Sequence, residues 1–290
     1  MGRHANERGE AFPRAPTQAE WDVMGPEERA RVVESLPDEV TDEELAMPEG
    51  DLHYYGKADT RDALLGYFGR KKRKVYIGSE LPIYYPGERR FAPDLLVVLD
   101  AEPHKRGKWM VSKEGKGLDW VMEVHVGGDR KKDAEYNVKR YARLGIPEYF
   151  IYDRSKEALL GYRLATPEAR TYTPMTPRQG RFVSQTLGLE LEVVDEKLRL
   201  WAGDELLLES AELLERMQGM MEQVQRRADE ATLRNQDLER RLAEAARLRE
   251  EETRRREEET RLRQEETRRR EDAERRLAEL EARLGQRQPH

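Results

Sequence analysis

Two acidic residues stand where apolar β-strands are expected, and their types and positions suit them to chemistry. Asp94 begins the run PDLLVV, and Glu123 interrupts the run DWVMEVHV. A carboxylate among Val, Met and Trp side chains is costly to bury unless it has a partner. Two carboxylates on neighbouring strands can hold Mg²⁺, which prefers oxygen ligands, and such an ion can polarise a phosphodiester and activate water. Spacing alone leaves a structural alternative open, in which Glu123 lies at a sheet edge or in an ion pair.

The elements that must position these carboxylates follow one another from Val75 onward. Short runs rich in β-branched and aromatic residues predict strands at VYI, LPIYY, PDLLVVLD and DWVMEVHV, then at EYFIYD, ALLGYRL, 181–184 and 187–194. A helix is predicted over 133–144, closed by Gly145. Because strands lie on both sides of this helix, we expect an α/β or α+β fold in which at least the part of the sheet across the helix is parallel. Earlier helices are predicted over 26–36 and around 64–68.

The chain from about Met47 to Trp201 resembles the Uma-two restriction endonuclease family, a branch of the PD-(D/E)XK nuclease superfamily. The residues that carry the resemblance are Pro93-Asp94-Leu-Leu-Val-Val, Glu123-Val124, Asp133 and the run YARLGIPEYFIYD, which is the most specific of them. The resemblance implies a restriction-endonuclease-like mixed sheet flanked by helices. It also implies that Asp94 and Glu123 are metal ligands, and a long C-terminal coiled coil is a common attachment in relatives.

One position departs from the family pattern. The family usually has a lysine four residues after the helix aspartate, and this chain has Asn137 there. The other usual position for the superfamily lysine, two residues after the glutamate, is His125. His125 shares a strand face with Glu123 and could act as a general base or an extra ligand, or be a half-buried strand histidine. Lys132, just before the predicted helix, could reach the site from the loop.

Basic clusters supply a further clue to the partner. Arg70–Lys74 precedes the first strand, five basic residues lie in the loop between the two acidic strands, and Arg130–Lys132 forms a third patch; the five are Lys105, Arg106, Lys108, Lys113 and Lys116. If these clusters converge on Asp94 and Glu123, they would offset the repulsion between carboxylates and DNA phosphates. Taken individually, each cluster is more typical of a solvated surface run.

The C-terminal part predicts a different architecture. Between Gly203 and Pro289 there is no proline, and apolar residues recur with a seven-residue period. Positions a are Leu207, Leu214, Met221, Ala228, Asn235 and Leu242, and positions d are Ser210, Met217, Val224, Ala231, Leu238 and Ala245. This pattern predicts a coiled coil over 207–245, and a lone Asn at position a favours a parallel dimer. Residues 249–273 place Arg at a and Glu at d, and we expect a charged helical rod, paired or solvated.

Composition sets the outer limits. Charged residues make up 39% of the 290 residues, the net charge is −6 and there is no cysteine, which excludes disulfides, thiolate zinc sites and cysteine nucleophiles. No apolar run reaches the length of a membrane span, and we expect a cytoplasmic protein that does not bind membranes. The expected organisation is an N-terminal segment with a short helix (1–44, partly disordered), a restriction-endonuclease-like domain (45–203), a coiled-coil helix (204–285) and a tail (286–290).

Together these observations predict a DNA endonuclease that depends on Mg²⁺ or Mn²⁺ and forms a homodimer through 207–245. Its predicted catalytic residues are Asp94, Glu123, His125 and Lys132, with Asp94 and Glu123 as metal ligands. The alternative, motivated by Asn137, is a catalytically degenerate nuclease fold that acts as a binding or scaffold protein through its coiled coil. A third reading makes the coiled coil the functional part and the α/β domain a head group.

Overall fold

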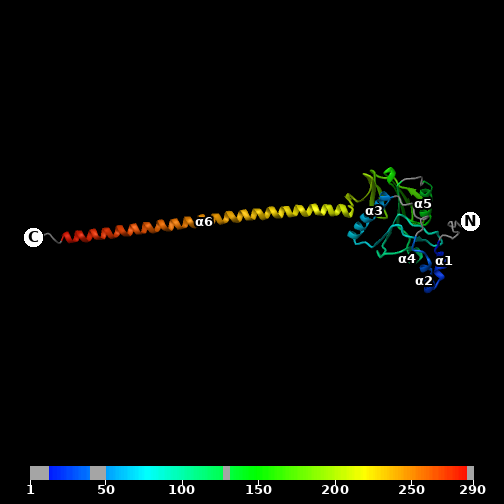
Figure 1. Cartoon of the computed structure of the whole chain (residues 1–290), viewed down its shortest axis with the longest axis horizontal. Helices are drawn as coiled ribbons and strands as arrows, with labels where there is room; N and C mark the ends of the chain where they lie inside the picture. The colour runs from blue at the N-terminus through cyan, green and yellow to red at the C-terminus, as the bar shows by residue number, and fades with distance from the viewer. Residues whose placement is uncertain (1–12, 40–49, 127–130, 286–290) are drawn as a thin grey trace. The chain divides into compact units, whose positions relative to one another are not determined.

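The computed structural model of the chain describes residues 13–39, 50–126 and 131–285. The chain divides into two compact units, with the boundary after Glu215. The first contains three β-sheets with their helices, and the second is the greater part of one long helix (Figure 1). The expected domain boundaries stay predictions, and the one at residues 44–45 lies outside the described residues.

A six-stranded mixed sheet forms the centre of the first unit, in the order β1-β3-β5-β6-β7-β8. Its strands are β1 (Val75–Gly78), β3 (Leu95–Leu99), β5 (Trp120–His125), β6 (Glu148–Asp153), β7 (Ala158–Leu164) and β8 (Tyr172–Pro174). Strands β5 and β6 are parallel, and every other pair in this sheet is antiparallel. The mixed α/β sheet and the parallel pair across the predicted helix are therefore confirmed.

Two smaller sheets complete the strands. One has the order β12-β11-β10-β9 and the other pairs β2 with β4 in parallel. Their strands are β2 (Ile83–Tyr84), β4 (Trp109–Met110), β9 (Phe182–Ser184), β10 (Leu189–Val194), β11 (Lys197–Ala202) and β12 (Glu205–Leu206). The sequence did not predict β4, β8, β11 or β12. Three of these have only two or three residues, too few for an alternating pattern to be recognised.

The helices are α1 (Gln18–Val23), α2 (Pro26–Ser35), α3 (Gly50–Lys71), α4 (Val111–Glu114), α5 (Lys131–Arg143), the 3₁₀ turn η1 (Arg154–Lys156) and α6 (Ser210–Gly285). Helix α2 confirms the prediction over 26–36 and begins with Pro26 in its first turn. Helix α5 confirms the prediction over 133–144. The unpredicted α1 has a capping box, in which the side chain of Thr17 accepts a bond from the Glu20 amide while Glu20 accepts one from Thr17.

Helix α3 is much longer than its apolar residues indicated. The prediction covered little more than the turns around Leu64, whereas the helix has 22 residues. Its N-terminal half buries His53, Gly56, Lys57 and Thr60, which are polar or small. Hydrophobic periodicity cannot reveal a helix whose buried face is not hydrophobic.

Gly56 explains how closely this half of α3 approaches the sheet. A Cβ atom at this position would lie 2.9 Å from the side chain of Val124 in β5, a distance at which something must shift. The absence of a side chain therefore lets α3 pass directly over β5. This approach brings the residues one turn away on α3 to the end of β5 where Val124 lies.

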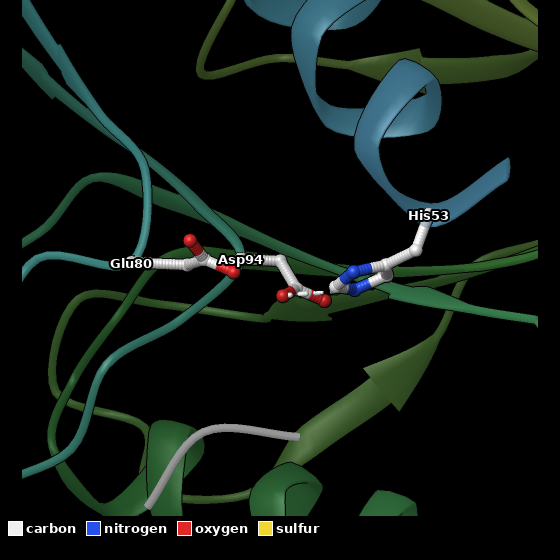
Figure 2. A group of neighbouring side chains, drawn as sticks. All are labelled: His53, Glu80 and Asp94. Atoms are coloured by element: carbon white, nitrogen blue, oxygen red, sulfur yellow. Dashed lines mark ion pairs between the residues drawn. The ribbon is translucent and has the colours of Figure 1, made fainter. Parts of the chain in front are cut away.

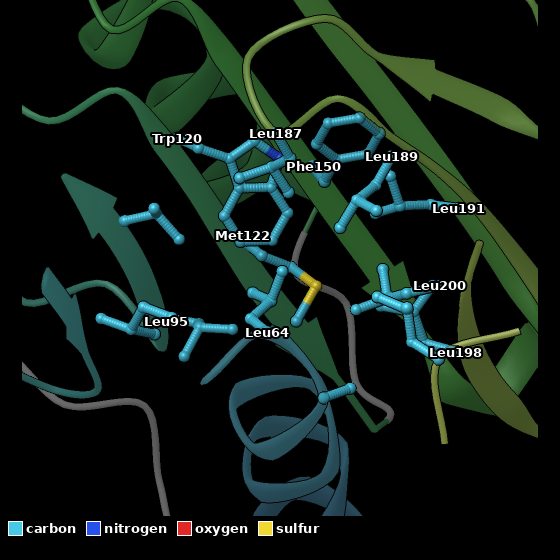
Figure 3. Close-up of a cluster of buried hydrophobic side chains, with 14 of the residues drawn as sticks. Leu64, Leu95, Trp120, Met122, Phe150, Leu187, Leu189, Leu191, Leu198 and Leu200 are labelled. Atoms are coloured by element: carbon cyan, nitrogen blue, oxygen red, sulfur yellow. The ribbon is translucent and has the colours of Figure 1, made fainter. Parts of the chain in front are cut away.

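Apolar clusters cover both faces of the central sheet. On the first face, Leu64 of α3 and Met122 of β5 pack with Leu198 and Leu200 of β11 (Figure 3). On the second face, Val121 of β5 belongs to a cluster that includes residues of α5. Strand β5 is therefore covered on both sides, and a carboxylate in it lies in largely apolar surroundings.

Helix α6 is one uninterrupted helix of 76 residues. Leu207, predicted as the first position of the pairing seam, precedes it and is wrong as a seam residue. Its amide donates to the Leu200 carbonyl at 2.8 Å and its side chain is buried in the first cluster. The seam residues inside the helix, among them Leu214 and Leu238, are exposed in the single chain.

Farther along α6, Glu250 pairs with Arg254 at 3.5 Å. Pairs four residues apart, such as Glu252–Arg256 at 2.6 Å, support the charged rod from within one helix. No helix in the described ranges is both long and apolar enough to cross a membrane.

Candidate functional site

Asp94 lies directly before β3 and is almost fully buried, with 7% of its surface exposed. Its Oδ2 atom accepts a hydrogen bond of 2.8 Å from the amide of Val124 in β5. Its carbonyl accepts a second bond, of 2.7 Å, from the hydroxyl of Ser79. Backbone and side chain of Asp94 are thus held between two neighbouring segments, and this fixes the direction of the carboxylate.

Glu123 comes to the same place from β5. Its Oε2 atom accepts a hydrogen bond of 3.2 Å from the amide of Asp94, and its Oε1 atom accepts one of 2.7 Å from the hydroxyl of Tyr141 on α5. Asp94 therefore exchanges hydrogen bonds with Glu123 and Val124 across the β3–β5 pair. The structure brings together the two acidic residues that the sequence singled out.

The electrostatics of Glu123 show the cost of this arrangement. Burial, followed by the negative charge of Asp94, raises the pKa of Glu123 well above its ordinary value. Burial also raises the pKa of Tyr141, and the charge of Glu123 adds to the effect. Two carboxylates that repel each other in apolar surroundings call for a compensating positive charge.

Helix α3 and the loop after β1 contribute three residues that sequence reasoning missed: His53, Lys57 and Glu80. His53 Nε2 lies 3.1 Å from Asp94 Oδ1, and the Lys57 ammonium bonds the Glu80 carboxylate and lies 4.0 Å from Asp94 Oδ1. Figure 2 shows His53, Glu80 and Asp94 pointing toward one another from three segments. The only signal in the sequence was the spacing of His53 and Lys57, four residues apart and hence on one helix face.

Three of these residues could hold a metal ion. One ligand atom from each of His53, Glu80 and Asp94 lies within 4.8 Å of the other two. Although His53 Nε2 is buried and close to Asp94, it lacks hydrogen-bond geometry there and has no hydrogen-bond partner among the described residues. A buried nitrogen left in this way is suited to coordinate a cation. Asp94 belongs both to this group of three and to the predicted ligand pair Asp94–Glu123. Glu123 itself is not a member of the group of three.

The other residues that the sequence singled out for the site are His125, Lys132 and Asn137. His125 is half-buried in β5, two residues beyond Glu123 and on the same strand face. Lys132 lies in the first turn of α5, and its side chain falls outside the described part of the structure. Arg130 also falls outside it. Asn137 is half-buried on α5, one turn before Tyr141.

Five residues of the predicted basic clusters pair with acidic side chains. Arg73 pairs with Asp100, Lys74 with Glu102, Arg106 with Glu114, Lys108 with Asp38 and Lys116 with Asp119. Lys105 and Arg106 do line one cleft of about 680 Å³ together with Lys57 and Glu80. Of the described residues in these clusters, Lys105 and Arg106 are the ones that line this cleft.

A family model matches part of this chain, and a solved structure is similar to it. The sequence model of the Uma2 family, described as "Putative restriction endonuclease", matches residues 39–199. Among solved structures, the chain is similar to "a putative nuclease belonging to DUF820" from Anabaena variabilis, with 15% identity, a TM-score of 0.41, and coverage of 52% of this chain and 82% of that chain. No curated protein matches the sequence.

Proposed function

Because the chain belongs to the Uma2 family of restriction-endonuclease-like proteins, we propose that it is a metal-dependent endonuclease that hydrolyses phosphodiester bonds of DNA. The observation that carries the proposal is the meeting of Asp94 and Glu123 across β3 and β5, with His53 and Glu80 beside them. Mg²⁺ or Mn²⁺ is the proposed cofactor. Asp94 and Glu123 are the proposed ligands, and His53 and Glu80 are within reach of the same place.

The donor set fits a divalent cation. Carboxylate oxygens suit Mg²⁺ and Mn²⁺, and an imidazole nitrogen adds affinity for Mn²⁺. The raised pKa of Glu123 fits as well, because a nearby cation would relieve the repulsion that burial and Asp94 impose. A bound divalent ion would polarise the phosphodiester and lower the pKa of a coordinated water.

The chain's own residues supply positioning. The Val124 amide and the Tyr141 hydroxyl each fix one carboxylate oxygen, and the Asp94 amide fixes a second oxygen of Glu123. Outer-shell contacts of this kind hold ligands in a productive direction. His125 and Lys132 remain proposed contributors, as a base or extra ligand and as a cation, respectively.

Plasmid cleavage tests this function. Purified protein is incubated with supercoiled DNA and Mg²⁺ or Mn²⁺, alongside Asp94→Asn and Glu123→Gln variants and an EDTA control. The expected result is cleavage by the wild type that EDTA and either substitution abolish. Cleavage that survives both substitutions would show that the nuclease site lies elsewhere.

Asn137 favours one alternative function, in which the chain has a catalytically degenerate nuclease fold and acts as a binding or scaffold protein through its coiled coil. This alternative predicts no cleavage with any metal ion but retained self-association. It also predicts that Asn137→Lys creates activity that the wild type does not have. A head-group role, with the coiled coil as the functional part, predicts that 204–290 alone reproduces partner binding.

Dimerisation through the C-terminal helix is the second part of the proposal. The seam predicted over 207–245 loses Leu207 to the core, so the proposed pairing surface begins within α6. A parallel homodimer is favoured because Asn235 occupies an a position, where two copies can bond each other in register. A cytoplasmic location stays a prediction.

A further inference from the structure

Lys57 holds an unusual position for a lysine. Only 8% of its surface is exposed, and its ammonium bonds the Glu80 carboxylate and lies 4.0 Å from Asp94 Oδ1. Lysine is almost never buried without a partner, and here its partners are two acidic residues of the candidate site. Among the described residues, it is the lysine whose ammonium comes within 4.0 Å of Asp94.

Helix α5 lacks a lysine at the position where the family pattern expects one. Asn137 lies there, one turn before Tyr141, whose hydroxyl bonds Glu123. Lys139 is exposed and points elsewhere, because two helical steps turn it by about 200°. The expected cation would thus approach the carboxylates from the α5 face, whereas Lys57 approaches them from α3.

We infer that Lys57 is a catalytic residue and supplies from α3 the positive charge that Asn137 cannot supply from α5. The inference rests on the proposed nuclease function. Its target is the scissile phosphate, where the ammonium would contact a non-bridging oxygen. There it would stabilise the charge that develops as water attacks phosphorus and gives up a proton to solvent, while the sugar oxygen leaves and takes up a proton from solvent. A preorganised cation in a water-poor site is effective in this role.

Charge balance supports this role. Asp94, Glu123 and Glu80 bring three negative charges, which a divalent ion and one ammonium together neutralise. Without Lys57 the site would keep a net negative charge toward an incoming phosphate, and at short range in a buried site that repulsion is poorly screened. The charge of Lys57 is therefore suited to the substrate as well as to the resting site.

The cleft beside the site shows where a substrate could meet Lys57. Lys57 and Glu80 line this space of about 680 Å³, together with Arg61, Lys105 and the exposed Tyr54. Cationic side chains in the lining suit a phosphate backbone, and an aromatic side chain suits a base. Lys57 thus lies between Asp94 and a space that a DNA strand could enter.

A cleavage series tests the inference. It compares wild type, Lys57→Gln, Lys57→Arg and Lys57→Gln/Asn137→Lys, with Lys156→Gln as a control on an exposed lysine that pairs with Asp153. Single-turnover rates and KM are measured on one oligonucleotide duplex, and Mn²⁺ affinity is measured by electron paramagnetic resonance. We expect Lys57→Gln to lower the rate by about 10²-fold or more with little change in KM and undiminished Mn²⁺ binding. Lys57→Arg should retain more activity, and Asn137→Lys should restore at least about a tenth of the wild-type rate.

Several results would overturn the inference. The first is a Lys57→Gln rate within about threefold of wild type. The second is loss of Mn²⁺ binding together with cleavage in Lys57→Gln, as a purely structural lysine would give. The third is a double variant that stays as slow as Lys57→Gln. A wild type that cleaves no DNA would remove the proposed function and this inference with it, whereas the first three results leave the nuclease function intact.

A second arm does not depend on the folding of Lys57→Gln. Asn137→Lys is introduced alone into the wild type. If Lys57 already supplies the cation, the added lysine should change the cleavage rate by less than about threefold. A gain of about tenfold or more would show that the cation was missing and would overturn the inference.

Discussion

Glu123 accepts a hydrogen bond from the backbone amide of Asp94 at 3.2 Å, while the Asp94 carboxylate accepts one from the amide of Val124, the next residue after Glu123. The two acidic residues therefore fix each other through the pairing of β3 and β5. A change in either carboxylate should disturb a shared site and not a single contact.

The first prediction follows from this coupling. Asp94→Asn and Glu123→Gln should each lower metal-dependent DNA cleavage by more than about 10²-fold, because even outer-shell partners of metal ligands contribute 10–100-fold. Each should also abolish the rise in Tm that Mn²⁺ gives the wild type. Asp100→Asn is the matched control, an exposed aspartate at the other end of β3 that pairs with Arg73. Equal losses in all three variants would contradict a specific role.

Two buried tyrosines give the second prediction. Tyr141 donates a 2.7 Å hydrogen bond to Glu123, whereas the hydroxyl of Tyr149, buried in the same cluster, has no hydrogen-bond partner among the described residues. Tyr141→Phe should lower the free energy of unfolding by about 1–3 kcal/mol and weaken Mn²⁺ binding about tenfold. Tyr149→Phe should be neutral or stabilising, because it removes an unsatisfied polar group. Urea unfolding and metal titration measure both effects, and a larger loss for Tyr149→Phe would refute the argument.

The sequence revealed the acidic pair because Asp94 directly precedes an apolar strand and Glu123 interrupts another. The register of β3 and β5 then brings both to one place. The central sheet was predictable for the same reason, since most of its strands show β-branched and aromatic runs. His53 and Lys57 were not predictable. They lie on a face of α3 that is buried but consists of polar and small residues. Gly56 lets this face pack closely against β5, and hydrophobic periodicity gives no sign of such packing. Leu207 was wrongly predicted as a seam residue, because its apolar side chain fits the heptad register but is buried in the core of the first unit.

The third prediction concerns pH and the start of α6. Arg199 binds both carboxylate oxygens of Glu212, at 2.8 and 3.1 Å, and this hydrogen bonding lowers the pKa of Glu212 below its ordinary 4.5. A lowered folded-state pKa gives stability that is present above pH 4.5 and is lost as the pH falls through the lowered value. Glu212→Gln should therefore cost about 1 kcal/mol at pH 7 and almost nothing at pH 2.

Urea unfolding of the first unit at the two pH values measures this difference. Glu215→Gln, one turn later and exposed, is the control and should be silent at both. A Glu212→Gln penalty that persists undiminished at pH 2 would mean that the side chain stabilises by packing and not by charge.

The last prediction distinguishes leucines of α6 that a partner helix would bury from leucines that stay exposed to solvent. Leu238 occupies position d of the proposed seam and Leu233 lies off it, yet both are exposed in the single chain, at 51% and 66%. If two copies pair through the seam, Leu238→Arg removes apolar burial worth about 1.5–3 kcal/mol from each chain and places two cations opposite each other. The dimer dissociation constant should then rise by about 10²-fold or more, while Leu233→Arg leaves it unchanged. Sedimentation equilibrium measures both constants. Equal effects of the two substitutions would refute a seam with a seven-residue period, because a helix without such a seam would not distinguish two exposed leucines. A monomeric wild type would refute the homodimer.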